Sequence, residues 1–396
     1  MSALKDLRVI ELGTFVAGPF CGTILGEFGA EVIKIEAPGA GDALRQFGTR
    51  TECGDTYVWL SESRNKKCAT LNVRTPRGRA LLEDLIGKCD IVVENFRPGV
   101  LEKWGLGWER IHAINPRAIL VRISAYGQNG PYKDRPGFAR VAHAFSGLAH
   151  LAGEPGRTPV IPGSTSLADY MAGIYGALGA LMALHARETS GVGQCVDLAL
   201  YEPIFRVLDE LVPAFQRSGI VRERMGADTV NVCPHSHYRT KDGKWIAIAC
   251  SNDTMFERLA VAMGAEHLSG AQLFGLKDKR LAARAEVNRL VQDWVGSLDC
   301  AEVLKRCEET GTPASLIYSI QDIFDDPQYQ ARRNIRMCDS RIGPLAVPAV
   351  VPNLSATPGE IRWLGESVGA HNEQVFCGLL GLAKRELDEL AAQGVI

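Results

Sequence analysis

The chain has 396 residues, of which 46% are hydrophobic, and this is enough apolar material for a sizeable core and for two or more domains. Its formal net charge of -2 gives no overall attraction to nucleic acid or to an anionic membrane, so we expect neither as a partner. Any anion-binding site must therefore be local.

Strand patterns alternate with helix patterns along the first 123 residues. The strands are predicted over 7–12, 32–35, 90–93 and 118–123, and the helices over 17–28, 78–88 and 101–115. Strands separated by helices of this length favour a parallel, doubly wound sheet. The chain enters its first strand without the apolar core of a signal peptide, so we expect a cytoplasmic protein.

The loop between the first strand and the first helix argues against a nicotinamide cofactor. It runs from Gly13 to Pro19 without the GxGxxG pattern that binds dinucleotides. Pro19 also lacks the backbone N–H that would help to hold a pyrophosphate.

Basic residues gather on segments that should end near one edge of this sheet. They are Arg45, Arg64, Lys66, Lys67, Arg74, Arg97 and Lys103. Beside Asn95 and Phe96 they offer phosphate contacts next to an aromatic platform, which suits a phosphorylated adenine ligand. The alternative is a solvated surface, and this is the default interpretation for Lys66 and Lys67.

Asp169 interrupts an otherwise uncharged helical pattern from about Gly163 through Leu184. The residues from Gly163 to Ser166 supply N-cap candidates, so Asp169 should lie in the first helical turn and stay ionised. Either Ser166 and Asp169 form a structural capping box, or the carboxylate is reactive. Because the uncharged run over 170–184 is shorter than the ~20 residues of a membrane span, we expect a buried helix.

The remaining chain is expected to contain a second, smaller α/β domain over 225–325. A strand over 194–198 and a helix over 202–217 precede it. Within it, a Lys-Asp-Gly turn predicts a hairpin over 238–249, and helices follow over 254–263 and 281–298. The last seventy residues look strand-poor and end in a helix over 384–392.

Histidines and cysteines give no sign of a metal site. His235 and His237 have no third ligand nearby, while His143 and His150 are expected to be satisfied core residues. The eleven cysteines form no CxxC pair and are expected to be buried free thiols in a reducing compartment. No G-x-S-x-G element indicates a serine hydrolase.

Short motifs follow one another in order along the whole chain. They are Leu7-Arg-Val-Ile-Glu-Leu12 with Ala17-Gly18-Pro19, Gly29-Ala-Glu-Val-Ile-Lys-Ile-Glu36, Arg64-Asn-Lys-Lys67, Val93-Glu-Asn-Phe-Arg-Pro-Gly99, Tyr126-Gly-Gln-Asn-Gly-Pro131, Leu167-Ala-Asp169, Gly191-Val-Gly-Gln-Cys-Val-Asp197, and Gly311-Thr-Pro-Ala314 ahead of Asp326-Pro327. With these motifs the chain resembles the family III CoA-transferases, which include formyl-CoA:oxalate, carnitine and succinate–glutarate CoA-transferases, and the related 2-methylacyl-CoA racemases.

The resemblance implies a fold and an assembly. The large domain would be Rossmann-like and built from both chain ends, 1–220 and 326–396, with the smaller α/β domain over 225–325 inserted. Two subunits would interlock as a homodimer with the active site between them. The acyl-CoA and carboxylic acid would be substrates, without a metal or a permanently bound cofactor.

The resemblance also implies the roles of individual residues. Asp169 would attack an acyl-CoA thioester and carry the covalent intermediates. The residues expected to line the CoA site are Val16, Ala17, Leu71, Arg74, Asn95, Phe96, Arg97 and Lys103, with Arg135 reaching a phosphate.

Departures from the family pattern narrow the expected activity. Oxalate-type enzymes have Gln at the position of Val16, a Tyr-Glu pair at Phe138-Ala139 and a glycine-rich lid that is absent around 225–240. Racemases carry a catalytic His at the position of Phe138, and phenylalanine cannot deprotonate a carbon acid. A racemase is therefore the second hypothesis. A non-catalytic CoA-binding protein is the third, and the intact Asp169 argues against it.

The segment over 231–238 resembles the branch of the family that uses succinate and other dicarboxylates. We expect succinyl-CoA as donor and a C4 to C6 dicarboxylic acid of the malate, citramalate, itaconate or glutarate type as acceptor. Its distal carboxylate needs a cationic or hydrogen-bonding partner. Arg222, Arg224, His235 and His237 are candidates, although they fit ordinary polar loop residues equally well.

Overall fold

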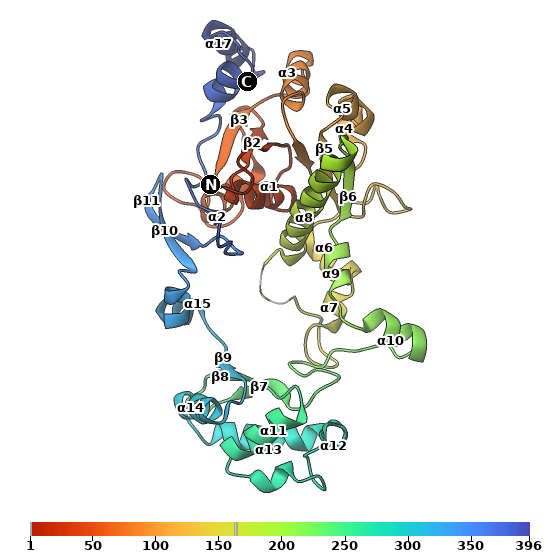
Figure 1. Cartoon of the computed structure of the whole chain (residues 1–396), viewed down its shortest axis with the longest axis vertical. Helices are drawn as coiled ribbons and strands as arrows, with labels where there is room; N and C mark the ends of the chain where they lie inside the picture. The colour runs from red at the N-terminus through yellow and green to blue at the C-terminus, as the bar shows by residue number, and fades with distance from the viewer. Residues whose placement is uncertain (1, 162, 164) are drawn as a thin grey trace. The chain divides into compact units, whose positions relative to one another are not determined.

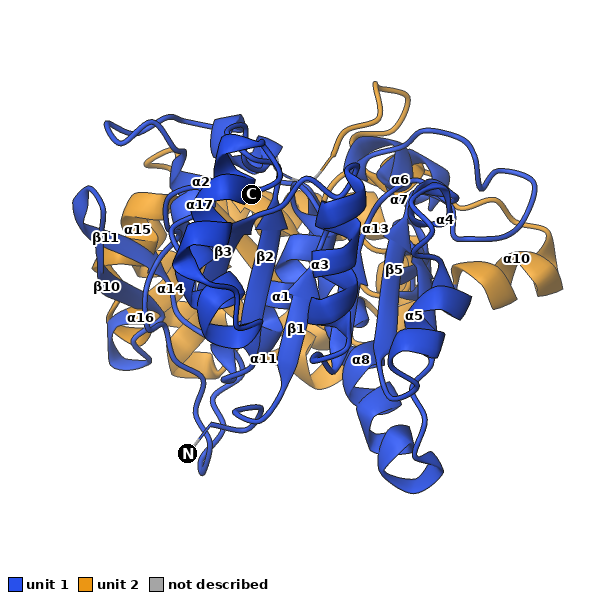
Figure 2. Cartoon of the chain, turned by 90° about the horizontal axis from the view of Figure 1, so that it is seen from above, with its two compact units in different colours: residues 1–148, 163–210, 330–396 blue, residues 149–162, 211–329 orange. Residues whose placement is uncertain are grey.

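The computed structural model describes residues 2–161, 163 and 165–396 (Figure 1). They form two compact units (Figure 2). The larger unit comprises 1–148, 163–210 and 330–396, and the smaller one comprises 149–162 and 211–329. Residues 149–162 and 211–220 thus group with the smaller unit.

A six-stranded parallel sheet with the order β3-β2-β1-β4-β5-β6 forms the centre of the larger unit. Its strands are β1 (Arg8–Glu11), β2 (Glu31–Glu36), β3 (Lys66–Thr70), β4 (Ile91–Glu94), β5 (Ile119–Ser124) and β6 (Cys195–Ala199). Both faces are covered, because the adjacent Val9 and Ile10 point to opposite faces and are each fully buried. The prediction of a parallel, doubly wound sheet is confirmed. The sequence did not predict strand β3, because two adjacent lysines in it are typical of an exposed surface segment.

Helices cover both faces of this sheet. The larger unit contains α1 (Ala17–Glu27), η1 (Ala43–Gln46), α2 (Tyr57–Glu62), α3 (Pro76–Ile86), α4 (Val100–Lys103), α5 (Trp108–Ile114), α6 (Ala139–Phe145), α8 (Leu167–Ser190), α9 (Glu202–Arg206), η3 (Glu373–Leu379) and α17 (Lys384–Ala392), and α7 (Leu148–Leu151) begins at its boundary. The expected helix over 101–115 is two helices, because the chain turns at Gly105, where φ is +74°. The helix expected over 202–217 is likewise divided, at Asp209 with φ of +54°.

Small residues let α8 pack closely on α1 and on the sheet. A Cβ atom at Gly173 would lie 2.9 Å from the Ala17 carbonyl oxygen, and one at Gly179 would lie 2.8 Å from Val196 Cγ1. The opposite face of α8 is exposed, including Leu178 and Met182, so the helix is buried on one side only. With 24 residues α8 is long and apolar enough to span a membrane by length and composition, which for a single helix is weak evidence. The expectation of a buried helix holds only for the face that packs on α1 and the sheet.

The C-terminal segment closes the outer edge of β3. The Cys68 N–H donates to His371 Nδ1 at 3.0 Å, and the His371 N–H donates to the Cys68 carbonyl oxygen at 2.9 Å. The Thr70 N–H donates to Asn372 Oδ1 at 2.8 Å. These bonds satisfy backbone groups that an edge strand would otherwise leave open to another chain.

A strand pair in the C-terminal segment corrects the expectation that it is strand-poor. Strand β10 (Ile335–Ser340) pairs antiparallel with β11 (Gly343–Pro348). The alternation of apolar and polar residues is weak here, because Arg336 and Met337 are both exposed. The hydrophobic period therefore gave no signal for a strand.

The smaller unit combines an antiparallel sheet of order β7-β8-β9 with several helices. Its strands are β7 (His235–Arg239), β8 (Trp245–Ala249) and β9 (Ala314–Leu316), and its helices include α10 (Leu211–Ser218), α11 (Asp253–Ala262), η2 (Glu266–Ser269), α12 (Lys277–Ala282), α13 (Arg284–Gly296), α14 (Cys300–Thr310) and α15 (Ile320–Asp325), while α16 (Pro327–Ala331) crosses the boundary. The hairpin predicted over 238–249 is confirmed, with Gly243 at φ of +83°.

All eleven cysteines are free, and seven of them are buried.

Candidate functional site

Asp169 lies in the first turn of α8, as predicted. The expected capping box does not form, because the Ser166 side chain makes no capping hydrogen bond and its carbonyl oxygen accepts from the N–H groups of Asp169 (2.9 Å) and Tyr170 (3.1 Å). Ser164, another N-cap candidate, lies outside the described residues. Within the described ranges the half-buried Asp169 carboxylate has no hydrogen bond or ion pair.

Burial raises the pKa of Asp169 to about 6. The carboxylate is therefore mostly ionised at pH 7, as expected, but its environment does not depress its pKa. A carboxylate with a raised pKa is a stronger base than an ordinary aspartate and is still negatively charged at neutral pH. This combination suits a carboxylate that attacks an electrophile.

His143 on α6 contacts the backbone beside Asp169. The Ala168 N–H donates a hydrogen bond of 2.9 Å to His143 Nε2, and the His143 side chain is buried. Burial, with Arg140 nearby, lowers the pKa of His143. His143 is a core histidine, as expected, but it is not fully satisfied, because its Nδ1 has no hydrogen-bond partner among the described residues. The expectation is wrong for His150, which is half exposed and has its Nε2 3.5 Å from Glu223 Oε2.

Aromatic and apolar residues surround the start of α8. Tyr170 contacts the Phe20 ring edge-to-face at 4.8 Å and packs against the same cluster as Val16. Phe15, beside Val16, meets the Phe138 ring at 6.1 Å. The structure thus brings Val16 and Ala17, at the start of α1, against the first turns of α8. Phe138 is 68% exposed, so it stays available to a ligand.

A cavity of about 570 Å³ opens at the carboxyl ends of the first four strands. It contains three of the predicted CoA-site residues, namely Leu71, Arg74 and Phe96. Its full lining is Leu12, Thr14, Ile35, Glu36, Ala37, Pro38, Gly41, Asp42, Leu71, Asn72, Val73, Arg74, Phe96, Trp104 and Gly394. Parallel α/β sheets bind ligands in this position. A larger cavity of about 870 Å³, lined by residues between 332 and 366, contains none of the predicted site residues.

The remaining predicted CoA-site residues are not in the lining of this cavity. Asn95 holds the loop before α1, because its side chain accepts from the Thr14 N–H (2.7 Å) and donates to the Thr14 carbonyl oxygen (2.9 Å). Arg97 donates to the Asp134 carbonyl oxygen at 2.6 Å, and the Arg135 guanidinium lies 3.6 Å from the centre of the Tyr132 ring. Lys103 is exposed at the end of α4.

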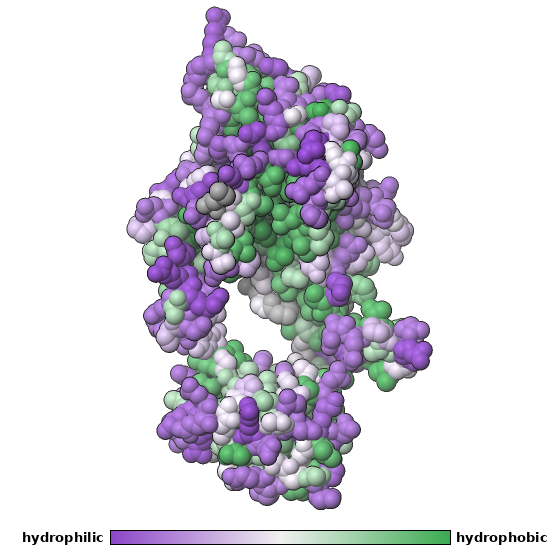
Figure 3. Space-filling model, in the orientation of Figure 1, coloured by the Kyte–Doolittle hydropathy of each residue, from purple (hydrophilic) through white to green (hydrophobic). Residues whose placement is uncertain are grey.

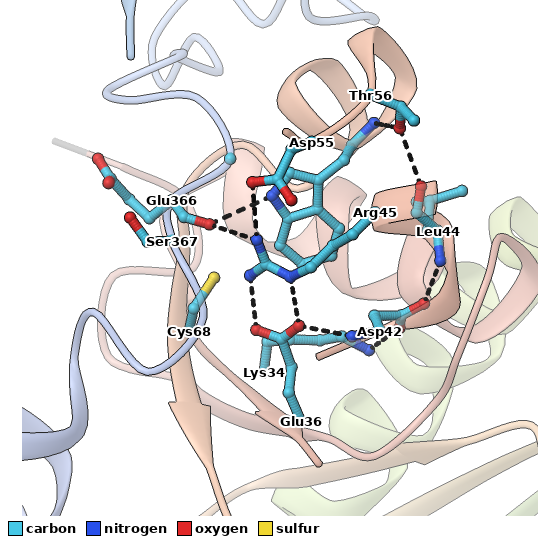
Figure 4. Close-up of polar contacts among 12 residues, drawn as sticks. Lys34, Glu36, Asp42, Leu44, Arg45, Asp55, Thr56, Cys68, Glu366 and Ser367 are labelled. Atoms are coloured by element: carbon cyan, nitrogen blue, oxygen red, sulfur yellow. Dashed lines mark hydrogen bonds and ion pairs between the residues drawn. The ribbon is translucent and has the colours of Figure 1, made fainter. Parts of the chain in front are cut away.

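Some of the basic residues that the sequence groups near one edge of the sheet are not available to a phosphate. Arg45 is buried, with its guanidinium bound to both Glu36 carboxylate oxygens at 2.8 Å and to Asp55 at 3.0 Å (Figure 4). Arg64 is also buried, and it donates to the carbonyl oxygens of Ser61 and Pro348. These charges are used inside the protein and are not available to a ligand.

A second buried charge cluster supports the loops around the cavity. Lys34 Nζ lies 2.6 Å from Asp42 Oδ2 and 3.3 Å from Glu11 Oε1, and it also donates to the Gly13 carbonyl oxygen. Asp42 accepts from the Phe15 N–H at 3.0 Å and so links this charge to the loop before α1. Although burial lowers the pKa of Lys34, the carboxylates around it raise that pKa above the usual lysine value.

Sequence reasoning missed Glu11, Glu36 and Asp42 as supports of the site. The local sequence carries no signal for this role, because Lys34 on β2 pairs with Glu11 on β1 and with Asp42 in the following loop.

His235 and His237 belong to the smaller unit. His235 Nδ1 is buried without a hydrogen-bond partner among the described residues, whereas His237 is exposed. His237 lines a cavity of about 750 Å³ together with Lys244 and Trp245. Arg224 donates to the His150 carbonyl oxygen at 2.7 Å. Among the residues that the structure describes, no group of three potential ligands could hold a metal ion.

Comparison with known proteins identifies the family to which the chain belongs. Residues 4–372 match the model of CoA-transferase family III. The chain is 52% identical over 396 residues to the beta subunit of succinyl-CoA–L-malate CoA-transferase from Chloroflexus aurantiacus, covering 99% of this chain and 98% of that protein. It is 43% identical to succinyl-CoA–D-citramalate CoA-transferase from the same organism, with coverage of 99% and 98%. A crystal structure of a CAIB/BAIF family protein from Brucella suis superposes with a TM-score of 0.84 at 31% identity, covering 96% and 99% of the two chains.

Proposed function

Because the chain belongs to CoA-transferase family III and is therefore a CoA-transferase, we propose that it moves CoA from succinyl-CoA to a small dicarboxylic acid. The similarity to the malate and citramalate enzymes supports an acceptor of the malate, citramalate, itaconate or glutarate type. The structural observation that carries the proposal is the partly buried Asp169 carboxylate at the start of α8, which has a raised pKa and no partner among the described residues.

The first half of the proposed reaction transfers CoA to the enzyme. The Asp169 carboxylate attacks the thioester carbonyl of succinyl-CoA, the C–S bond breaks, and CoA leaves as the thiolate. This gives a mixed anhydride between the aspartyl and succinyl groups. The thiolate then attacks the aspartyl carbonyl, so that succinate leaves and an aspartyl-CoA thioester remains.

The second half transfers CoA to the acceptor acid. An acceptor carboxylate attacks the aspartyl carbonyl, releases the CoA thiolate and forms a second mixed anhydride. The thiolate attacks the acceptor's carbonyl in that anhydride, which yields the new thioester and frees Asp169. Each covalent step is an acyl exchange without net oxidation, so the reaction as proposed needs CoA esters and acids but no permanent cofactor.

The cavity at the carboxyl ends of the strands is proposed to take the nucleotide end of CoA. Phe96 and Leu71 offer apolar contacts there, and the exposed Arg74 offers a charge for a phosphate. Val16 and Ala17 would then border the thioester, because α1 begins beside α8. Asn95, Arg97, Lys103 and Arg135 complete the proposed CoA site.

The distal carboxylate of the acceptor is proposed to bind His235 or His237, with Phe138 as an apolar wall of the pocket. His235 supports this role through its buried ring nitrogen, which has no hydrogen-bond partner in the described part of the chain. His237 lines a cavity that contains Lys244 but also Glu154, Asp228 and Asp322, so the charge of this cavity does not by itself favour a carboxylate. Arg222 and Arg224 are the further candidates.

We also propose an interlocked homodimer in the cytoplasm, with the active site between the subunits. The exposed apolar face of α8, which includes Ile174, Leu178 and Met182, supports a partner surface (Figure 3). One relative is named as a beta subunit, so a mixed assembly with a related chain is the competing arrangement. Sedimentation of the chain expressed alone distinguishes the homodimer from the mixed assembly. A stable, active monomer would refute the proposed homodimer.

Racemisation of 2-methylacyl-CoA is the second candidate. It needs a base at the position of Phe138, and a phenyl ring cannot take up a proton. The decisive experiment incubates the protein with succinyl-CoA and a panel of carboxylic acids and identifies the CoA esters by mass spectrometry. We expect dicarboxyl-CoA products with release of succinate. If no acid exchanges and 2-methylacyl-CoA is epimerised, the transferase proposal is wrong.

A further inference from the structure

His143 connects a separate helix to the first turn of α8, one residue before Asp169. Its Nε2 accepts the Ala168 N–H at 2.9 Å, and its side chain is 1% exposed. The first N–H groups of a helix have no partner within the helix and need an acceptor from elsewhere. Ser166, at the N-cap position, does not supply one with its side chain. The imidazole therefore acts as the side-chain cap that the local sequence lacks.

This hydrogen bond determines the protonation state of the ring. Nε2 can accept only when it carries no proton, so the neutral ring holds its proton on Nδ1. Burial favours this neutral form. Nδ1 is itself buried and has no hydrogen-bond partner among the described residues, so within them the ring is held by its hydrogen bond to α8.

We propose that His143 is a positioning residue for the nucleophile. By holding the Ala168 N–H it fixes the first turn of α8, and with it the direction of the Asp169 carboxylate, which has no hydrogen bond of its own in the described structure. A carboxylate without a direct partner must be oriented through its backbone. This inference rests on the proposed role of Asp169 and adds a residue that does not touch the substrate.

The position of α6 gives the same hydrogen bond a second consequence. The helix begins after Phe138 and ends at Phe145, so His143 and Phe138 belong to one short rigid element. Anchoring this helix to α8 through His143 sets the distance between the Phe138 wall and the nucleophile. His143 thus links the helix that follows Phe138 to the turn that carries Asp169.

The test compares His143→Gln, whose amide oxygen can accept the same N–H, with His143→Leu, which has no acceptor. His185→Ala, at the exposed far end of α8, is the matched control. Succinyl-CoA is the probe. With an acceptor acid of the malate type it gives kcat and KM, and without an acceptor it gives the rate at which the aspartyl-CoA thioester appears in rapidly quenched samples by mass spectrometry. We expect His143→Leu to lower kcat and thioester formation by about ten- to a hundredfold without changing KM, and His143→Gln to restore most of the rate.

The outcomes separate this inference from the proposed function. If the wild-type protein forms no aspartyl-CoA thioester, the covalent mechanism itself fails. If the wild type forms it and folded His143→Leu does so equally fast, only the positioning role is wrong. Nitrogen NMR of the wild-type protein shows which ring nitrogen of His143 carries the proton, and this measurement does not depend on how any variant folds. A protonated Nε2 throughout the pH range of activity would overturn the hydrogen bond on which the proposal stands.

Discussion

Lys66 Nζ lies 2.9 Å from Glu11 Oε2, and both side chains are completely buried between β3 and β1. The ammonium group also donates to the Pro19 carbonyl oxygen at 2.6 Å, at the start of α1. The neighbouring Lys67 is paired with Glu31 at 2.6 Å but is partly exposed. Two adjacent lysines in one strand therefore have different roles, one in the interior and one near the surface.

This pair of lysines gives a matched test of stability. We expect Lys66→Met to lower the free energy of unfolding by about 3 to 5 kcal/mol, because it leaves the Glu11 carboxylate buried with fewer partners. Lys67→Met should cost less than about 1 kcal/mol, since solvent screens its ion pair. Urea unfolding followed by circular dichroism measures both, and equal losses would contradict the assignment.

Replacing Asp169 tests the nucleophile directly. Asp169→Ala should abolish CoA exchange and the aspartyl-CoA thioester, because the attacking carboxylate is gone. The variant should still bind CoA esters, since the proposed nucleotide cavity is lined by other residues. Mass spectrometry of the intact protein after addition of succinyl-CoA reports the adduct. More than a trace of exchange in pure protein would refute the assignment.

The reaction rate should fall at acid pH as the Asp169 carboxylate becomes protonated. Its pKa of about 6 means that the reactive anion disappears as the pH falls through 6. We therefore expect kcat/KM for succinyl-CoA to be constant above this value and to fall about tenfold for each pH unit below it. Steady-state rates between pH 4.5 and 8 in buffers of constant ionic strength give the profile. A flat rate down to pH 4.5 would show that another group carries the reaction.

The same raised pKa predicts that the ionised Asp169 carboxylate lowers the stability of the folded protein. The folded protein binds the Asp169 proton up to about pH 6, whereas the unfolded chain releases it near 3.8, so stability falls as the pH rises between these values. Asp169→Asn should raise the free energy of unfolding by about 1 to 3 kcal/mol above pH 6 and by less near pH 4. Denaturant unfolding at both pH values is the measurement, with Asp84→Asn on the exposed face of α3 as control. A gain independent of pH would point to packing instead.

Arg74 should contribute to binding rather than to chemistry. It is exposed at the cavity, where a phosphate of CoA can reach it without leaving a buried charge behind. We expect Arg74→Ala to raise KM for succinyl-CoA by about tenfold with kcat unchanged, as for a charge-assisted contact. Arg110→Ala, which removes an exposed pair with Glu83 on the neighbouring α3, is the control. Equal KM values for the two variants would remove Arg74 from the CoA site.

The sequence predicted the parallel sheet and the first-turn position of Asp169 because both depend on local patterns. Apolar strands and helix starts are visible in a few consecutive residues. The buried pairs of Lys34, Arg45 and Lys66 could not be predicted in this way, since each pairs with an acid from a distant segment or another element. The same residue types on a surface would give the same local sequence.

The cap supplied by His143 was missed for a related reason. Its partner is a backbone N–H 25 positions away, and a backbone group has no sequence signature. Ser166, by contrast, has the right residue type at the right position and still makes no side-chain cap. Local capping rules name a candidate, and the packing of neighbouring helices decides whether it is used.

The hydrogen bonds by which the C-terminal segment covers the edge of β3 have a consequence for synthesis on the ribosome. His371 and Asn372 are synthesised about 300 positions after the strand that they cover. Until they emerge from the ribosome, the nascent sheet has an open edge, which is able to add a strand from a neighbouring chain. A stop codon shortly before residue 371 should therefore yield aggregates rather than a truncated but folded enzyme, and nascent chains should need protection by a chaperone until residues 371 and 372 have emerged.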